Sequence, residues 1–279
     1  MISSTFVAPL PSRAVIEVRG PDWRDFLQGL ITQDVVTLAS GEMRFAALLT
    51  PQGRVLYDLF IVRRGDDGLI DCQAATCDAL VERLVMYRLR ARVEIARSRA
   101  PVLASWGTDA PPAGFIPDPR TPGLGSRGYD EAMLTADAVG ENDYVAHALA
   151  LGVPSSADWG SDATYPIEAN FDLLGGIDLK KGCFVGQETT SRMKRRGAIR
   201  SRMVPIIMDG PVPASGAELL AGSLRAGEVR SGFGRRAIAL LRLDRLQAGN
   251  LTYGGGQGWR PDWPLWLAPE RPASDQSVI

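Results

Sequence analysis

The sequence is poor in the residues that most often build metal sites, disulfides and catalytic bases. It has one histidine, His147, and three cysteines in 279 residues. A histidine-based metal site needs two or three imidazoles, so no metal site of this class is expected. Serine and cysteine triads would have to use His147 as their base, which disfavours those mechanisms. An odd number of cysteines predicts no disulfide framework and is typical of a reducing compartment.

Long apolar runs and an excess of one charge are also missing. No stretch reaches the ~20 apolar residues that a helix needs to cross a bilayer. Residues 1–10 have neither the pattern of a signal peptide nor that of a transit peptide. The net charge of −1 gives no overall field that would attract nucleic acid or a membrane. We therefore expect a cytoplasmic protein with no membrane partner and no direct binding of nucleic acid.

The first half of the chain alternates strand and helix patterns. Apolar alternation predicts a strand over 13–19. Turn signals divide 43–73 into strands at 43–49, 55–63 and 69–73, and two more strands are expected at 92–96 and 102–106. Helical apolar spacing predicts helices over 22–31, 76–89 and 143–151. Turn signals separate consecutive strands, which favours an α+β fold over a doubly wound sheet.

Residues 110–128 are rich in proline and glycine and are expected to be a loop. They contain a Gly-x-Gly-x-x-Gly pattern at Gly123, Gly125 and Gly128. A dinucleotide site needs this pattern directly after a buried strand, whereas Pro119 and Pro122 precede it here, so no nucleotide site is expected. Short strand patterns after residue 197 predict a C-terminal β-barrel. The expected division is 1–198 for the N-terminal region and 199–279 for the barrel.

Residues 180–188 combine unusual chemistry in a short space. They hold two lysines, a thiol, an aromatic ring, an amide and a carboxylate, with two glycines that let the backbone turn or approach a ligand closely. The stretch Lys-Gly-Cys-Phe-Val-Gly-Gln-Glu at 181–188 resembles the signature of the YgfZ-type folate-binding proteins. Segments 26–35, 49–54, 87–90, 151–154 and 166–170 agree with the same family.

The YgfZ group is related to the glycine-cleavage aminomethyltransferase (GcvT) and is implicated in the assembly or repair of iron–sulfur clusters. The resemblance implies a GcvT-like, three-domain α+β arrangement around a central cavity, with a ferredoxin-like region and a C-terminal β-barrel. It implies tetrahydrofolate as the cofactor, bound without classical turnover. The implied partners are folate and the iron–sulfur assembly machinery or its client enzymes. The alternative is a folate-dependent aminomethyl or one-carbon transferase, and a third possibility, in line with a link to tRNA modification, is a tRNA-binding module.

The resemblance also assigns the candidate site residues. Those with candidate catalytic roles are Cys183, Lys181 and Asp58, and those expected to bind the cofactor are Glu168, Asp58, Tyr57, Phe184, Gln187 and Arg88. Glu168 matches an acidic position that contacts the pterin in the aminomethyltransferases. Aromatic rings can cover the flat pterin, and an arginine suits the anionic glutamate tail of folate.

Some positions depart from the family or stay open. Tyr57-Asp58 stands where the aminomethyltransferase has two aspartates, which disfavours aminomethyl transfer. Cys183 is open to three interpretations: a buried structural residue, a reactive thiolate or a transient ligand for iron or a cluster. Cys72 and Cys77 are expected to be structural. The six cations between residues 192 and 202 are interpreted as a solvated strap or as the anion-binding side of the cavity, with contact to RNA phosphates as the alternative.

Overall fold

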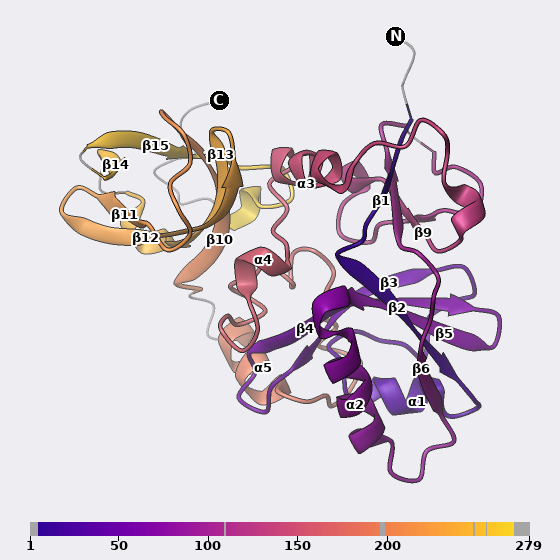
Figure 1. Ribbon diagram of the computed structural model, residues 1–279. Coiled ribbons are helices and arrows are strands. Elements are labelled where there is room, and N and C mark those ends of the chain that lie inside the picture. Colours follow the sequence, from indigo (N-terminus) through magenta and orange to yellow (C-terminus); the bar gives the residue numbers. More distant parts are fainter. Residues whose placement is uncertain (1–4, 109, 196–198, 248, 255, 271–279) are drawn as a thin grey trace.

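The computed structural model describes residues 5–270, apart from residues 109, 196–198, 248 and 255. Two sheets and a closed barrel make up the fold, and the two sheets lie together while the barrel stands at their side (Figure 1). In the range described, no helix is long and apolar enough to cross a membrane. The expected α+β class is confirmed.

The first sheet has five antiparallel strands in the order β3-β4-β5-β2-β6. Their bounds are β2 (Arg13–Arg19), β3 (Met43–Leu49), β4 (Val55–Arg64), β5 (Asp67–Gln73) and β6 (Glu94–Arg97). All five were predicted from the sequence. Side chains alternate between the two faces of a strand, so on β4 Leu59 and Ile61 join one buried cluster and Phe60 and Val62 another.

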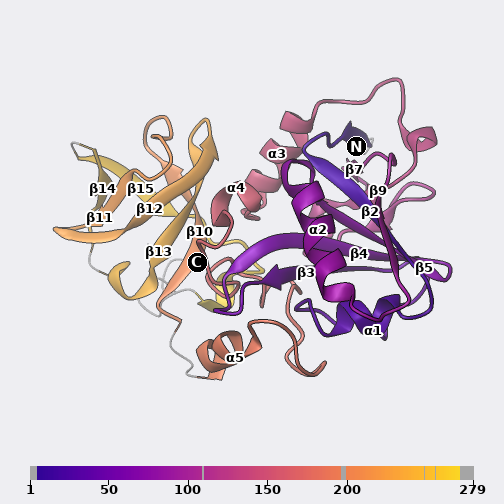
Figure 2. The same ribbon diagram turned by 60° about the horizontal axis from the view of Figure 1, so that its bottom comes forward.

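Two helices, α1 (Trp23–Gln28) and α2 (Cys77–Arg88), cover one face of this sheet (Figure 2). Trp23 and Leu27 of α1 and Leu80 and Leu84 of α2 are buried against it. Burying each such side chain contributes about 1.5–3 kcal/mol, which fixes both helices on the sheet. Cys77 and its neighbour Cys72 are part of this core, as predicted for structural cysteines.

The second sheet has the order β1-β7-β9-β8. Its strands are β1 (Phe6–Pro9), β7 (Leu103–Trp106), β8 (Ile116–Pro117) and β9 (Ser126–Gly128). The prediction of a plain loop over 110–128 is therefore wrong. The glycines allow close packing: a Cβ on Gly125 would lie 2.0 Å from the Ser105 carbonyl oxygen.

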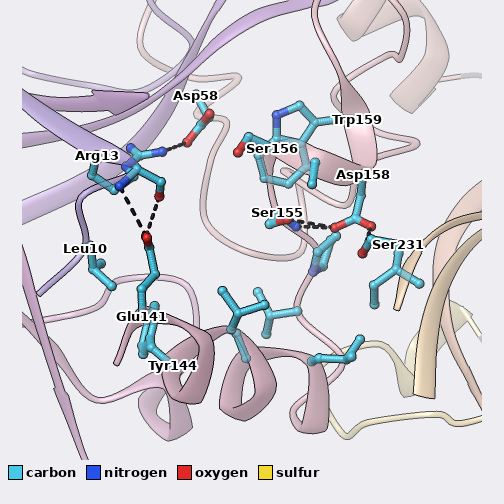
Figure 3. Close-up of a pocket in the computed structure, with 18 of the residues that line it drawn as sticks. Leu10, Arg13, Asp58, Glu141, Tyr144, Ser155, Ser156, Asp158, Trp159 and Ser231 are labelled. Atoms are coloured by element: carbon cyan, nitrogen blue, oxygen red, sulfur yellow. Dashed lines mark hydrogen bonds and ion pairs between the residues drawn. The ribbon is translucent and has the colours of Figure 1, made fainter. Parts of the chain in front are cut away.

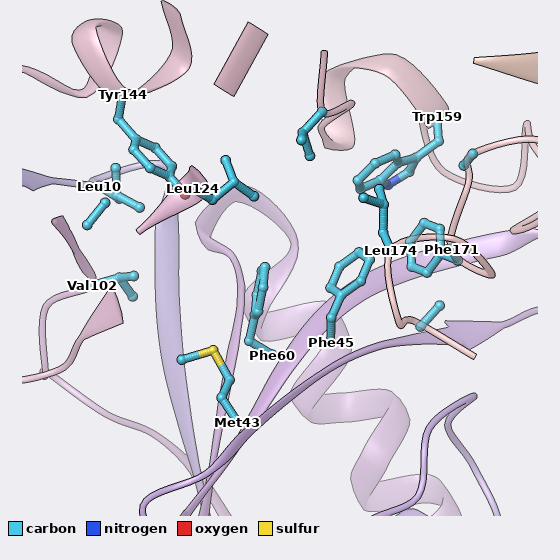
Figure 4. Packing of buried hydrophobic residues seen from close by; sticks show 14 of the residues in the cluster. Leu10, Met43, Phe45, Phe60, Val102, Leu124, Tyr144, Trp159, Phe171 and Leu174 are labelled. Carbon is cyan, nitrogen blue, oxygen red and sulfur yellow. The ribbon is translucent and has the colours of Figure 1, made fainter. Parts of the chain in front are cut away.

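Helices α3 (Glu141–Ala150) and α4 (Ser156–Trp159) follow, and α5 (Gln187–Arg195) precedes the barrel. Short 3-10 turns occupy Ala74–Thr76, Pro122–Leu124, Glu131–Met133, Leu243–Arg245 and Ala268–Glu270. The second face of the five-stranded sheet shares a buried cluster with side chains of α3 and α4. There Phe45 stacks on Phe171 at 4.6 Å between ring centres, and Trp159 meets Phe171 edge-on at 5.1 Å (Figure 4).

The C-terminal barrel closes in the order β10-β13-β12-β11-β14-β15. Its strands are β10 (Ser201–Met208), β11 (Glu218–Ala221), β12 (Leu224–Phe233), β13 (Arg236–Arg242), β14 (Leu251–Tyr253) and β15 (Gln257–Pro261). Closure pairs every strand on both sides and leaves no free edge. The predicted barrel is confirmed, while the expected boundary at residue 198 lies outside the described residues.

Candidate functional site

A cavity of about 340 Å³ lies where the five-stranded sheet, α3, α4 and the barrel meet (Figure 3). Its walls include Arg13 of β2, Asp58 of β4, Tyr144 of α3, Asp158 of α4 and Ser231 of β12. The volume lies within the range of small-molecule sites, which are about 300–1,000 Å³. A ligand in this cavity would contact both the N-terminal layers and the barrel.

The sheet side of the cavity is built from buried ion pairs around Arg13. Its Nη1 donates to Asp58 Oδ2 at 2.6 Å, and its Nε donates to Asp71 Oδ1 at 2.6 Å. Arg127 Nη1 donates to the other oxygen of Asp71 at 2.8 Å. Burial by itself would lower the pKa of Arg13, but the charges of Asp58 and Asp71 raise it above its ordinary value. The guanidinium is therefore permanently charged and held rigidly.

A second group of ions extends this wall. Arg120 Nη2 donates to Asp118 Oδ2 at 2.8 Å, and Arg127 Nε donates to the same oxygen at 3.3 Å. Burial would raise the pKa of Asp118, but the two arginines hold it at about 2. The guanidinium carbons of Arg127 and Arg120 lie 3.8 and 4.9 Å from the ring centre of Phe60. Arg13, Arg120 and Arg127 all line the cavity, which gives it a wall of guanidinium groups balanced by buried carboxylates.

The opposite walls carry two carboxylates. Glu141 of α3 accepts from the Ser12 amide at 3.3 Å and from the Ser12 hydroxyl, so it ties α3 to the start of β2. Asp158 accepts from the Ser155 amide and from the Ser231 hydroxyl, both at 2.6 Å (Figure 3). Burial raises the pKa of Asp158. Asp158 therefore links α4 to the barrel across the cavity.

The segment at 180–188 lies behind this cavity rather than in its wall. Lys181 Nζ donates to the Ile31 carbonyl, just past the end of α1, at 2.8 Å and to the carbonyl of Gln28, the last residue of α1. Burial lowers the pKa of Lys181 to about 8. Its ammonium also lies 5.3 Å from the ring centre of Phe184. Lys181 thus fixes the segment to the N-terminal sheet.

The other candidate residues of the segment at 180–188 lie in different environments. Phe184 is buried in the same cluster as Trp159, which lines the cavity. Gln187 starts α5, and its Oε1 accepts from the Phe184 amide at 3.3 Å. Cys183 is exposed, whereas Cys72 and Cys77 are buried. The segment therefore presents its thiol to solvent and its aromatic ring to the core.

The other candidate residues are spread over the molecule. Tyr57 lies on the α1–α2 face of β4, opposite to Asp58, so these two neighbours cannot line one cavity. Glu168 is half-buried, and burial raises the pKa of its carboxyl group, which accepts from the Tyr165 amide at 3.2 Å. Arg88 ends α2 and is exposed. Only Asp58 of the predicted residues lines the cavity.

The expected cationic strap at 192–202 is partly wrong. Arg202 is fully buried, with Nη1 donating to the Ile167 carbonyl at 2.8 Å and to Asp172 at 2.9 Å. Lys194 also pairs with Asp172, at 2.8 Å. These cations hold α5 and the barrel to the N-terminal layers, because a buried carboxylate lies opposite them. Over the described residues, no group of three or more His, Cys, Asp or Glu side chains could hold a metal ion.

Comparison with known proteins places this geometry in context. Residues 11–110 match the family model described as the GCVT N-terminal domain, and residues 200–269 match the CAF17 C-terminal beta-barrel domain. The crystal structure of the glycine cleavage system aminomethyltransferase T from Bartonella henselae superposes with a TM-score of 0.75. It covers 96% of this chain and 87% of its own at 16% identity, which shows a shared fold. The expected GcvT-like arrangement is confirmed.

Curated relatives are similar along most of the chain. The human and mouse proteins named iron–sulfur cluster assembly factor IBA57, mitochondrial, are each 30% identical. The alignments cover 91% and 85% of this chain and 84% and 78% of the relatives. A homologue from Mycosarcoma maydis is 34% identical over 76% of this chain, which spans 60% of that protein's length.

The expected cytoplasmic location is wrong, because each of these relatives is named as mitochondrial. The YgfZ-type proteins and the IBA57 relatives belong to one GcvT-like group. This chain matches both the GCVT N-terminal domain and the CAF17 C-terminal barrel domain. On the similarity over most of both the human and the mouse protein, this chain belongs to the family of the iron–sulfur cluster assembly factor IBA57.

Proposed function

We propose that this protein binds tetrahydrofolate in the cavity beside Asp58 and serves the assembly of iron–sulfur clusters. The observation that carries the folate proposal is the pairing of a carboxylate with aromatic and arginine side chains in one cavity. The assembly role is supported by the relatives, whose names state it.

The walls suit the chemistry of a folate. A pterin is a flat ring with an N–H-rich edge, and a carboxylate such as that of Asp58 accepts such donors. Phe60, Tyr144 and Trp159 line the cavity and supply aromatic surface. The tail of folate is anionic, which suits the wall that holds Arg120 and Arg127. The buried ion pairs keep these groups in place before a ligand arrives.

Calorimetric titration with tetrahydrofolate under reducing conditions tests this proposal. We expect saturable binding to the wild type, at least about tenfold weaker binding to Asp58→Asn, and none to Ala148→Phe, which would fill the cavity that Ala148 lines. Asp244→Asn, at an exposed ion pair of the barrel, is the matched control and should bind as the wild type does. Wild-type protein that shows no saturable binding would end the folate proposal.

The exposed thiol of Cys183 is our candidate for the contact with iron–sulfur chemistry. It lies two residues from Lys181, whose ammonium is fixed, and it is open to solvent. A cluster usually needs four ligands, so one thiol would act together with ligands of another protein. In a strain lacking the gene, Cys183→Ser should fail to restore the activity of cluster-containing enzymes, whereas Cys72→Ser should restore it if the protein folds. Equal rescue by both variants would remove the thiol from the function.

One-carbon transfer is the alternative, favoured by the match to the GCVT N-terminal domain over residues 11–110. It needs a group near the reacting carbon that can exchange a proton. Arg13 engages one oxygen of Asp58 at 2.6 Å, which favours Asp58 as a fixed acceptor rather than a proton carrier. Incubation with tetrahydrofolate, ammonia and a lipoyl-bound aminomethyl donor decides between the two. Turnover by wild type and its loss in Asp58→Asn would establish the transferase.

A further inference from the structure

The C-terminal end of α2 and the loop that follows it expose large apolar side chains. Met86 is 76% exposed and Leu89 is 88% exposed, and Val85 and Tyr87 beside them are also exposed. We call residues 85–90 the α2 tip. Figure 1 shows the loop between α2 and β6 at the bottom of the molecule, on the side away from the barrel. Single exposed apolar residues are ordinary, but several large ones at one end of a helix are typical of an interaction surface.

Leu89 is held in a strained backbone conformation. Its φ is +45° and its ψ is −106° at the C-terminal cap of α2. Glycine or asparagine normally occupies such a cap, because a side chain with a Cβ is disfavoured at positive φ. Leucine gains no burial that would offset this strain, since its side chain points into solvent. Strained residues cluster at functional sites, so the exposed leucine needs a role other than folding.

The surroundings of the α2 tip are cationic. A groove of about 510 Å³ beside it is lined by Arg19, Arg88, Arg90 and Arg92, and Glu94 is the one acidic residue among those that line it. Arg92 pairs with Asp22, and Arg19 pairs with Glu17. In the part of the chain that the structure describes, no ion pair involves Arg88 or Arg90. Arg88 Nη1 donates to the Val93 carbonyl at 3.4 Å, and within the described residues both guanidinium groups lie without a carboxylate partner and can pair with an anionic one.

We propose that the α2 tip is a docking site for an acidic protein surface, with Leu89 and Met86 entering apolar depressions of the partner while Arg88 and Arg90 pair with its carboxylates. Methionine, tyrosine and arginine are enriched at protein interfaces and lysine is depleted. Residues 81–94 contain four arginines and no lysine, so the cationic character of this stretch rests on arginine alone. The composition therefore favours a protein partner.

This site is separate from the folate proposal. The cavity that holds Asp58 is lined by none of the α2 tip residues. Loss of partner binding would leave tetrahydrofolate binding intact, and loss of folate binding would leave docking intact. The two proposals can therefore fail independently.

Photo-crosslinking identifies the partner. The full chain with benzoylphenylalanine in place of Met86 is expressed in its host cells, and the cross-linked peptides are mapped by mass spectrometry. Placement of the same group at Leu224, an exposed barrel residue, is the control. We expect a protein adduct specific to position 86 whose cross-linked peptide lies in an acidic surface. The absence of such an adduct, or one on a basic surface, overturns the proposal.

The partner identified by cross-linking is then purified and titrated with variants of this protein, which tests the role of each residue of the α2 tip. Leu89→Gly relieves the backbone strain, so its melting temperature should equal or exceed that of the wild type, while its Kd for the partner rises about tenfold or more. The double variant Arg88→Glu with Arg90→Glu should also weaken binding, and Arg64→Glu, at an exposed site elsewhere, should not. Binding that is unchanged in Leu89→Gly overturns the proposal. Binding to phosphatidylglycerol vesicles that is lost in Leu89→Gly, in place of binding to the protein, shows a membrane site and overturns it too.

Discussion

Gly53 and Gly186 approach each other backbone to backbone, and this contact joins the turn after β3 to the segment that carries Lys181 and Cys183. A Cβ on Gly186 would lie 2.9 Å from the Cα of Gly53 and 2.6 Å from the Thr50 carbonyl oxygen. Gly186 also has a φ of +78°. Both its conformation and the space around it therefore require glycine.

Gly186→Ala should lower the free energy of unfolding by about 2–4 kcal/mol, because backbone strain and steric overlap add. Gly216→Ala is the control, since Gly216 has a similar φ of +85° but nothing within 4 Å of its Cβ position. It should cost about 1–2 kcal/mol, from strain alone. Urea unfolding of the two variants measures the difference. Equal losses would mean that the close approach of the two segments does not contribute to stability.

Lys181 should titrate far below an ordinary lysine. Burial lowers its pKa to about 8 from the ordinary 10.5. The unfolded chain then binds this proton more tightly than the folded chain, so Lys181 makes the free energy of unfolding rise between about pH 8 and pH 10.5. The chain has three lysines, Lys180, Lys181 and Lys194, so NMR of the reductively methylated protein gives three lysine signals besides that of the N-terminal amine. Lys181→Arg assigns the signal, and a midpoint near 10.5 would contradict the buried environment.

Asp71 links two arginines of the cavity wall. It is fully buried and binds Arg13, Arg127 and the Tyr129 hydroxyl. Asp71→Asn leaves two buried guanidinium groups short of a counter-charge, and loss of one partner from a buried ion pair costs about 3–5 kcal/mol. Thermal unfolding should show this loss, whereas Asp244→Asn, in an exposed pair with Arg242, should change stability little. A loss as small as that of the exposed pair would show that water reaches the wall.

Local patterns predicted most of the strands and the helices α1 and α2, since each buries a face with regular spacing. They failed for α5, because this helix is polar almost all round and only Thr190 is buried. A helix without an apolar stripe gives no periodic signal. They also failed for β8 and β9, which are two and three residues long and rich in proline and glycine.

The site depended on contacts that no local pattern contains. Asp58 was named from the family resemblance, but its partner Arg13 lies 45 residues earlier and reads locally as the polar end of a strand. Arg202 looked like a surface cation, and its burial follows from Asp172, 30 residues earlier. Asp158 and Ser231 are 73 residues apart, and only the packing of α4 on the barrel brings them together. The cavity is therefore a product of tertiary structure.

The protein should be more stable at neutral pH with an amide at position 158 than with the carboxylate of Asp158. Burial raises its pKa above the ordinary 3.8, so the folded chain binds this proton more tightly than the unfolded chain. Asp158 therefore lowers the free energy of unfolding as the pH rises from its unfolded pKa to its folded pKa. Above both pKa values the full cost of the buried charge is present.

Asp158→Asn removes that charge and keeps an oxygen for the Ser155 amide and an N–H₂ group for the Ser231 hydroxyl. The variant should therefore melt at a higher temperature than the wild type at pH 7, and the difference should vanish below about pH 4. Asp158→Ala is the matched control: it loses both acceptors and should be destabilised by about 1 kcal/mol or more at either pH. If Asp158→Asn is destabilised at pH 7 as Asp158→Ala is, the charge itself holds α4 to the barrel, and a nearby cation such as Arg230 is its counter-ion.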